Sequence, residues 1–276
     1  MVLRFFMLAG VFLFLSCVTA ERDNPNDPGS KDYQGYQVID PPSSSKPSSS
    51  SFAAKSSSSG AVSSSSVNIL GGCPNAEMGN NTISCGGQSY KTVKIGEQVW
   101  MAENLNYNAP NSKCYGDYTG GDRQGNCAIY GRLYNWATAM ANSAGSNANP
   151  SGVRGVCPSG WHIPSDAEWN TLMKFVNPSC TDNSSCAGAG KKLKANSPLW
   201  ENSGKGTDDF DFSALPGGHT NTAGNSNTVG YGGSWWSASE YDSGETSYRY
   251  ISGNRESVDW YNVGKGIFFS VRCVQD

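Results

Sequence analysis

The stretch CPSGWHIPSDAEWNTLMKFV, residues 157–176, contains the clearest structural signals in the chain. Ser165 and Glu168 have the spacing of a capping box, in which each side chain accepts a hydrogen bond from the other residue's backbone N–H at the start of a helix. The apolar residues that follow recur at helical spacing: Trp169, Leu172, Met173 and Val176. This stretch therefore predicts an amphipathic helix that begins after Ser165 and ends before Pro178.

The patterns on either side of this helix predict an α+β domain. Upstream, Tyr130–Asn142 has its apolar residues on one helical face and predicts another helix. Earlier still, Tyr90–Trp100 surrounds a Gly-Glu turn and predicts a β-hairpin. Four short aromatic or β-branched segments then predict an antiparallel sheet: Ser234–Glu240, Ser247–Ile251, Val258–Val263 and Phe268–Val274. Two helices and such a sheet define the expected fold class.

The N-terminal residues 1–17 predict an export signal. Arg4 precedes the apolar run Phe5–Leu15, and about eleven apolar residues suit a signal peptide but not a membrane span, which needs roughly 20. Two processing sites are open. Leu15–Cys17 resembles a lipobox, which would make Cys17 the lipidated N-terminus, whereas Val18–Ala20 resembles an ordinary cleavage site. We favour lipidation of Cys17 because the apolar run ends directly before it.

Residues 18–72 predict a disordered, serine-rich stalk. Ser43–Ser66 contains fifteen serines among 24 residues. Serine buries almost no apolar area, so nothing in this segment offsets the entropy cost of ordering the backbone. The aromatic-rich residues 73–276 are numerous enough for one globular domain.

Cysteine content indicates an oxidising compartment. Besides Cys17 the chain has eight cysteines, an even number, and none of them forms a C-x-x-C unit typical of a zinc site. We therefore expect four disulfides in a domain outside the cytoplasm. Cys114 with Cys127, and Cys180 with Cys186, would each close a short loop.

Seven blocks between residues 90 and 274 resemble the Fibrobacter succinogenes major paralogous domain. They are YKTVKIG (90–96), WMAENLNY (100–107), YGRLYNW (130–136), CPSGWHIPS (157–165), FSALPGG (212–218), WWSASE (235–240) and FSVRCV (269–274). The family comprises exported, often lipid-anchored proteins without an established activity. Its block order also resembles the C-type lectin-like fold shared with the formylglycine-generating enzyme. That resemblance implies a disulfide between Cys157 and Cys273, which leaves Cys73 with Cys85.

No catalytic residue, cofactor or metal site is predicted. His162 is expected to be a hydrogen-bonded structural imidazole, and His219 belongs to no recognisable nucleophile pairing. The acidic cluster of Asp208, Asp209 and Asp211 would be a glycosidase pair only if two carboxyls faced each other, and we expect a solvated turn. A stabilising Ca²⁺ at this cluster is the alternative left open. The copper chemistry of the formylglycine-generating enzyme is not expected, because the resemblance assigns its cysteine counterpart to a disulfide.

Aromatic residues in the C-terminal half suggest where a ligand would bind. Aromatic rings stack on the apolar faces of sugars, although alternate residues of a strand must face the core. On that basis one of Trp235 and Trp236 should be buried. We predict that Trp236 or Trp260 contacts a glycan beside two connecting loops, Asn202–Asp211 and Gly217–Gly233.

These observations predict a non-catalytic binding or adhesion module for plant-fibre polysaccharide, carried by an outer-membrane lipoprotein at the cell surface. A secreted or periplasmic location is the alternative. The net charge of −3 argues against nucleic acid as a partner, and the membrane would be reached only through the lipid anchor. Two other functions stay open: a protein-interaction or structural module of a surface assembly, and an enzyme of unknown chemistry.

Overall fold

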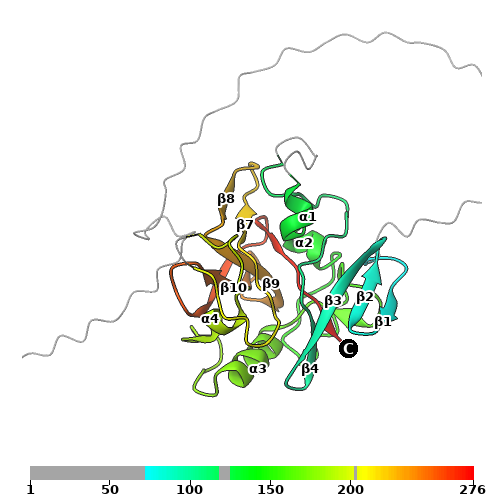
Figure 1. Cartoon of the computed structure of the whole chain (residues 1–276). Coiled ribbons are helices and arrows are strands. Elements are labelled where there is room, and N and C mark those ends of the chain that lie inside the picture. The colour runs from blue at the N-terminus through cyan, green and yellow to red at the C-terminus, as the bar shows by residue number, and fades with distance from the viewer. Residues whose placement is uncertain (1–71, 118–124, 202–203) are drawn as a thin grey trace, which may run out of the picture. The chain divides into compact units, whose positions relative to one another are not determined.

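The computed structural model describes residues 72–117, 125–201 and 204–276 (Figure 1). The predicted signal 1–17, its lipidation site Cys17 and residues 18–71 of the expected stalk lie outside the described residues. The described part is mainly β-structure, arranged in two largely antiparallel sheets with four short helices. The sequence predicts two helices and a mainly antiparallel sheet, and the described part has more β-structure than that prediction.

The first sheet joins the two ends of the described domain. Its strands are hydrogen-bonded in the order β1 (Glu77–Gly79), β2 (Thr82–Cys85), β3 (Gln88–Ile95), β4 (Gln98–Met101), β13 (Val274–Gln275) and β6 (Trp161–His162). The predicted hairpin is confirmed as β3–β4, and Gly96 in its turn has φ 63°, a conformation that favours glycine. Strand β13 pairs with both β4 and β6, so the chain's last strand lies between these two strands and joins them in one sheet.

The second sheet contains the predicted C-terminal strands. Its order is β11 (Val258–Gly264), β10 (Glu245–Ser252), β9 (Gly232–Glu240), β12 (Phe268–Ser270), β7 (Gly217–Thr220) and β8 (Ser226–Val229), and β5 (Leu133–Asn135) also pairs with β12. The segment predicted as Phe268–Val274 is divided between β12 and β13, one in each sheet. The prediction of a connecting loop over Gly217–Gly233 is wrong, because these residues form the β7–β8 hairpin and the start of β9.

Helix α3 (Asp166–Val176) confirms the predicted capping box. The Glu168 N–H donates to Ser165 Oγ over 3.3 Å, and the Ser165 N–H donates to Glu168 Oε2 over 3.0 Å. The other helices are α1 (Asn126–Tyr130), α2 (Trp136–Ala139) and α4 (Ala189–Leu193). Over the three described ranges, no helix has the length and apolar character needed to cross a membrane.

The predicted helix over Tyr130–Asn142 is wrong, because long-range strand pairing overrides the helical periodicity. Gly131 has φ 77° and ends α1. Leu133–Asn135 then pairs antiparallel with β12 instead of continuing a helix. The Asn135 side chain accepts a hydrogen bond from the Thr138 N–H over 2.8 Å and starts the four-residue α2.

Both faces of the second sheet are covered, so it separates two hydrophobic cores. On one face Trp236, Tyr248 and Phe269 pack with residues from β5 and α2. On the other face Trp235 packs with residues from α3 and from the first sheet, including Trp169; Figure 1 shows α3 against this part of the fold. As a result Trp235 and Trp236 are both buried, although they point to opposite faces as predicted.

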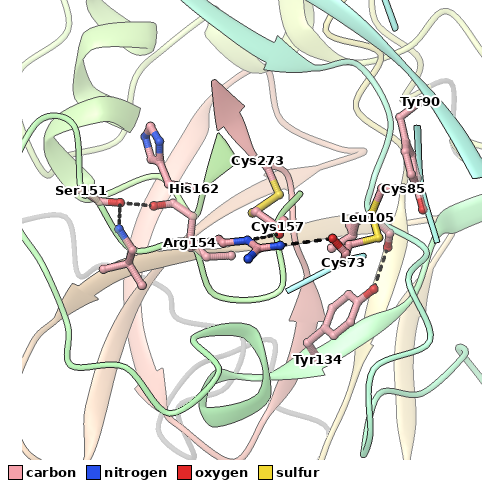
Figure 2. The surroundings of a disulfide bond; sticks show 12 residues. Cys73, Cys85, Tyr90, Leu105, Tyr134, Ser151, Arg154, Cys157, His162 and Cys273 are labelled. Atoms are coloured by element: carbon pink, nitrogen blue, oxygen red, sulfur yellow. Dashed lines mark hydrogen bonds between the residues drawn. A yellow bond between two sulfur atoms is a disulfide. The ribbon is translucent and has the colours of Figure 1, made fainter. Parts of the chain in front are cut away.

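The four disulfides join the predicted pairs: Cys73–Cys85, Cys114–Cys127, Cys157–Cys273 and Cys180–Cys186. Their Cα atoms are between 5.0 and 6.0 Å apart, within the range that a disulfide spans. Figure 2 shows two of these bonds on either side of the Arg154 guanidinium, which donates to the carbonyl oxygens of Cys157 and Cys73, each over 3.3 Å. This contact ties the start of the described domain to the long disulfide loop.

Candidate functional site

Trp260 lies on β11, an edge strand of the second sheet, and is partly exposed. In the strand register Trp260 is opposite Arg249, which is opposite Trp235, so the three residues share one face of the sheet. The first residue of α3, Asp166, holds the indole in place, since Trp260 Nε1 donates to Asp166 Oδ2 over 2.9 Å. The ring is therefore oriented by a helix terminus and still reaches the surface.

A cleft of about 630 Å³ opens beside this ring, and we call it the Trp260 cleft. It is lined by Asn147, Asn149, Asp166, Ala167, Asn170, Thr171, Lys174, Asp182, Asn183, Glu240, Tyr241, Ser247 and Trp260. Tyr241, 59 % exposed, provides a second ring whose centre lies 6.5 Å from that of Trp260, with the two planes at 64°. The cleft thus combines two aromatic rings with many amide and hydroxyl groups.

Hydrogen bonds between side chains order the polar wall of the cleft. Asn170 Nδ2 donates to Asn183 Oδ1 over 3.0 Å, and Asn149 Nδ2 donates to Thr171 Oγ1 over 3.3 Å. Behind this wall, Arg249 Nη2 donates to Asn170 Oδ1 over 2.8 Å. The amides therefore have defined positions before any ligand arrives, which reduces the entropy cost of binding.

Each carboxylate of the cleft has a cationic partner. Lys174 lies 2.8 Å from Asp182, and Lys265 lies 3.1 Å from Glu240. The third pair is buried: Arg249 Nη2 lies 3.6 Å from Asp166 Oδ1. Lys174 lines the cleft itself, whereas Lys265 and Arg249 lie beside it as partners of lining carboxylates. Counted together with these partners, the three carboxylates are balanced by three cations.

The buried pair is incompletely hydrogen-bonded. Burial lowers the pKa of Arg249 to about 10, and the charges of Asp166 and Asp182 oppose this shift, so the guanidinium stays protonated at neutral pH. Within the described ranges Arg249 Nη1 and Asp166 Oδ1 have no hydrogen-bond partner. Unsatisfied buried groups cost stability and are uncommon in folded proteins, which singles out this end of the cleft.

The region of the chain that contains the cleft matches a known protein family. The model of the Fibrobacter succinogenes major domain matches residues 93–275. The chain belongs to this family. No curated protein and no solved structure matches the chain. Every residue that lines the Trp260 cleft lies inside the matched major domain.

The two predicted glycan-binding tryptophans of the major domain have different environments. Trp236 is 1 % exposed, and its Nε1 donates to the Tyr134 carbonyl oxygen over 2.6 Å. Its prediction as a ligand contact is therefore wrong, because both faces of its strand are covered. The partial exposure predicted for one of the two is confirmed at Trp260. The expected neighbours were wrong for the described residues, since α3 and Tyr241 line the cleft in place of residues from 204–211 and 217–233.

The cleft residues around Trp260 were missed at the level of sequence. Asp166 and Asn170 lie within the predicted helical stretch, and Glu240 closes the WWSASE block. Tyr241 directly follows that block. No motif distinguishes these residues from other helix and strand positions, because an acidic residue in the first turn is an ordinary feature of a helix start.

The two histidines of the major domain are both buried, and His162 confirms its predicted structural role. Its Nε2 lies 2.6 Å from Glu168 Oε1 and its Nδ1 lies 2.7 Å from Asp276 Oδ1. Burial alone would lower the pKa of His162, but the hydrogen bonds and charges of these two carboxylates outweigh it and raise the pKa. His162 thereby links the capping box of α3 to the last residue of the chain. Burial instead lowers the pKa of His219 to about 4.

The acidic cluster around Asp208 forms a turn. Asp208 accepts hydrogen bonds from the N–H and the Oγ of Ser213, both over 2.7 Å. Its carboxylate is thus used to close the turn that leads into residues 212–218. In the part of the chain that the structure describes, no group of three His, Cys, Asp or Glu side chains is placed to hold a metal ion.

A second, larger groove of about 720 Å³ lies between β3, α1 and residues 211–215. The buried Asn104 at its base is fully engaged: its Oδ1 accepts from Trp235 Nε1 and Arg272 Nη2, and its Nδ2 donates to the Tyr130 carbonyl oxygen. The tyrosines among its described lining residues, Tyr90 and Tyr130, are buried. The Trp260 cleft is smaller, but it presents aromatic surface and is the better candidate.

Proposed function

We propose that this chain is an exported, lipid-anchored surface protein whose major domain binds plant-fibre polysaccharide without catalysis. One observation carries the proposal: Trp260 and Tyr241 present ring surface inside a cleft lined with amides and hydroxyls. Planar rings cover the apolar faces of sugar rings, while a few placed polar groups select and orient the hydroxyls.

In this proposal each part of the cleft has a separate role. Trp260 supplies the main stacking surface, and Asp166 acts as a positioning residue through its hydrogen bond to the indole. Asn149 and Asn170 offer amide groups to sugar hydroxyls from the polar wall. Tyr241 contributes a second ring at the rim.

Binding can be tested by affinity electrophoresis of the purified protein in gels that contain soluble cellulose derivatives, xylan or glucomannan. We expect retention in at least one gel, and we expect Trp260→Ala to weaken it at least about fivefold, by analogy with the roughly 1–3 kcal/mol that stacking of a nucleic-acid base on one aromatic ring contributes. Tyr231→Ala is the matched control, because Tyr231 is an exposed aromatic outside the cleft. Equal retention of Trp260→Ala and the parent would contradict the proposal and favour a protein-interaction module.

The proposed location rests on the N-terminal sequence and on the disulfides. The apolar run ends at Cys17, and the described domain contains four disulfides, which persist in oxidising compartments. Mass spectrometry of the mature protein should find a diacylated Cys17 as first residue. An unmodified terminus at Glu21 would overturn the lipid anchor. Residues 18–72 should be the first region cut by limited proteolysis, as expected of a disordered stalk.

The proposal also includes a C-type lectin-like architecture for the major domain. It is supported by the Cys157–Cys273 bond between the segment before α3 and the last strands, and by the pairing of β13 with strands from the start of the domain. Since no solved structure matches the chain, the proposal depends on these features and on block order. An experimental structure in which the second sheet fails to superpose on the lectin-like sheet would overturn it.

A further inference from the structure

We infer that the Trp260 cleft takes a single chain of a neutral polysaccharide, and neither an acidic glycan nor a crystalline polysaccharide surface. This inference rests on the proposed function and specifies its ligand. It follows from two independent features of the cleft, its charge pairing and the angle between its rings.

The charge pairing disfavours an acidic ligand. A polyuronate needs cations that are free to meet its carboxylates, as complementary sites provide. Lys174, which lines the cleft, is already within 2.8 Å of Asp182, and Lys265, which lies beside the cleft, is within 3.1 Å of the lining residue Glu240. Arg249 is buried beside Asp166 and cannot reach a ligand. A uronate would therefore meet one carboxylate beside each cation, whereas neutral sugar hydroxyls meet a site without net charge.

The ring geometry disfavours a crystalline surface. Rings that bind the flat face of a polysaccharide crystal must lie in one plane, so that each covers a sugar of the same surface. The planes of Tyr241 and Trp260 are inclined at 64° with centres 6.5 Å apart, so one flat surface cannot stack on both. A single chain can turn between successive sugar units and present a face to each ring. The cleft volume of about 630 Å³ is that of a site for a short segment of such a chain.

Three probes separate this inference from the proposed function. The purified parent protein is tested by affinity electrophoresis against soluble neutral chains (hydroxyethylcellulose, arabinoxylan and glucomannan) and against polygalacturonate, and by depletion on microcrystalline cellulose. We expect binding to at least one neutral chain, with at least about tenfold weaker retention by polygalacturonate and by the crystalline probe. Comparable binding to polygalacturonate or to crystalline cellulose, lost in Trp260→Ala, would overturn this inference and leave the proposed function standing. Failure to bind any probe would overturn both.

A charge variant tests the pairing directly. Asp182→Asn with Glu240→Gln removes two negative charges from the lining of the cleft and leaves Lys174 and Lys265 without these carboxylate partners. This double variant should gain at least about tenfold in retention by polygalacturonate at low salt, and lose the gain at high salt because exposed charges are screened. The matched control, Glu97→Gln with Glu256→Gln, removes the carboxylates of two exposed pairs outside the cleft and should gain nothing. Equal retention of the two double variants would overturn the charge argument.

Discussion

Strand β9, in the middle of the second sheet, is covered on both faces, whereas strand β11 at its edge is fully covered on only one. On β9, Trp235 and Trp236 belong to the two opposite cores. On β11, Tyr261 and Val263 face one core, while Trp260 on the other face reaches the Trp260 cleft. Each strand carries two adjacent aromatic residues, Trp235–Trp236 on β9 and Trp260–Tyr261 on β11, so their different exposure comes from what packs against each face.

This difference indicates how the domain combines stability with binding. A middle strand contributes large apolar side chains to both cores, and each of them also fixes its neighbours. The edge strand pairs with β10 along one side, while its other side is bridged to Cys186 at Val258. Helix α3 covers part of its outer face through Asp166. Residues at such an edge can present a ring to a ligand without opening the core.

The largest expected effect comes from removing disulfides. One disulfide lies near the middle strand β9 and another lies near the edge strand β11. Cys157–Cys273 is fully buried in the core beneath β9. The second disulfide is Cys180–Cys186, in which the backbone of Cys186 forms a β-bridge with Val258 at the start of β11. The loops span 116 and 6 residues, so the chain-entropy model gives about 5 kcal/mol for the first and about 2 kcal/mol for the second. Urea unfolding of the two double cysteine-to-alanine variants should show this order. Equal losses would mean that loop length does not govern the difference.

The next effect concerns the middle strand alone. Trp236→Ala should lower the free energy of unfolding by about 3–5 kcal/mol, because it leaves a cavity beside Phe269, whose ring centre lies 4.5 Å from that of Trp236. It also removes the hydrogen bond to the Tyr134 carbonyl oxygen. Denaturant unfolding monitored by fluorescence and circular dichroism gives the value. A loss below about 1 kcal/mol would show that this face of β9 is less tightly packed than the structure indicates.

Local signals were enough to predict much of this fold. The capping box of α3, the β3–β4 turn and the C-terminal strands all depend on residues close together in the chain, and each is confirmed. The two short-loop disulfides belong to the same class. The cysteine pair Cys157–Cys273 spans most of the domain and was found through family resemblance instead.

The β7–β8 hairpin missed in residues 217–233 is local, but the other wrong predictions depend on distant partners. Residues 133–135 became a strand because β12, more than 130 residues later, pairs with them. Trp236 was expected at a surface because strand alternation does not show whether the second face of a sheet is covered. The partial exposure predicted for one of the two tryptophans is confirmed at Trp260, but its neighbours Asp166, Asn170 and Tyr241 come from separate segments and were not predicted.

A third prediction uses the pH dependence of stability in the middle of the sheet. His219 on β7 packs edge-on against Phe269, with ring centres 5.9 Å apart, and burial lowers its pKa to about 4 from 6.5. The unfolded chain therefore binds this proton more readily, and stability falls as pH decreases from about 6.5 to about 4. The loss from this group reaches up to about 3 kcal/mol at the acid end.

His219→Asn removes the titrating group and isolates this effect. The difference in unfolding free energy between the parent and the variant should favour the parent near pH 7 and shrink progressively down to pH 4, as measured by urea unfolding at several pH values. A difference that stays constant over this range would show that the His219 imidazole is accessible to protons in the folded state. His162 is the internal contrast, because its raised pKa gives it the opposite dependence: its stabilisation is present below pH 6.5 and is lost as pH rises through the folded value.

The smallest expected effect on stability is that of Trp260→Ala. The side chain is partly exposed, so its removal leaves space that water fills, and water can replace the indole as the partner of Asp166 Oδ2. We expect a loss of about 1–2 kcal/mol, less than half of that for Trp236→Ala, in the same urea experiment. Trp260→Phe is the conservative control: it keeps a ring for stacking but cannot donate to Asp166. If Trp260→Ala destabilised the domain as much as Trp236→Ala, the edge strand would be as important to the core as the middle strand. Its loss of polysaccharide retention could then no longer be assigned to the cleft.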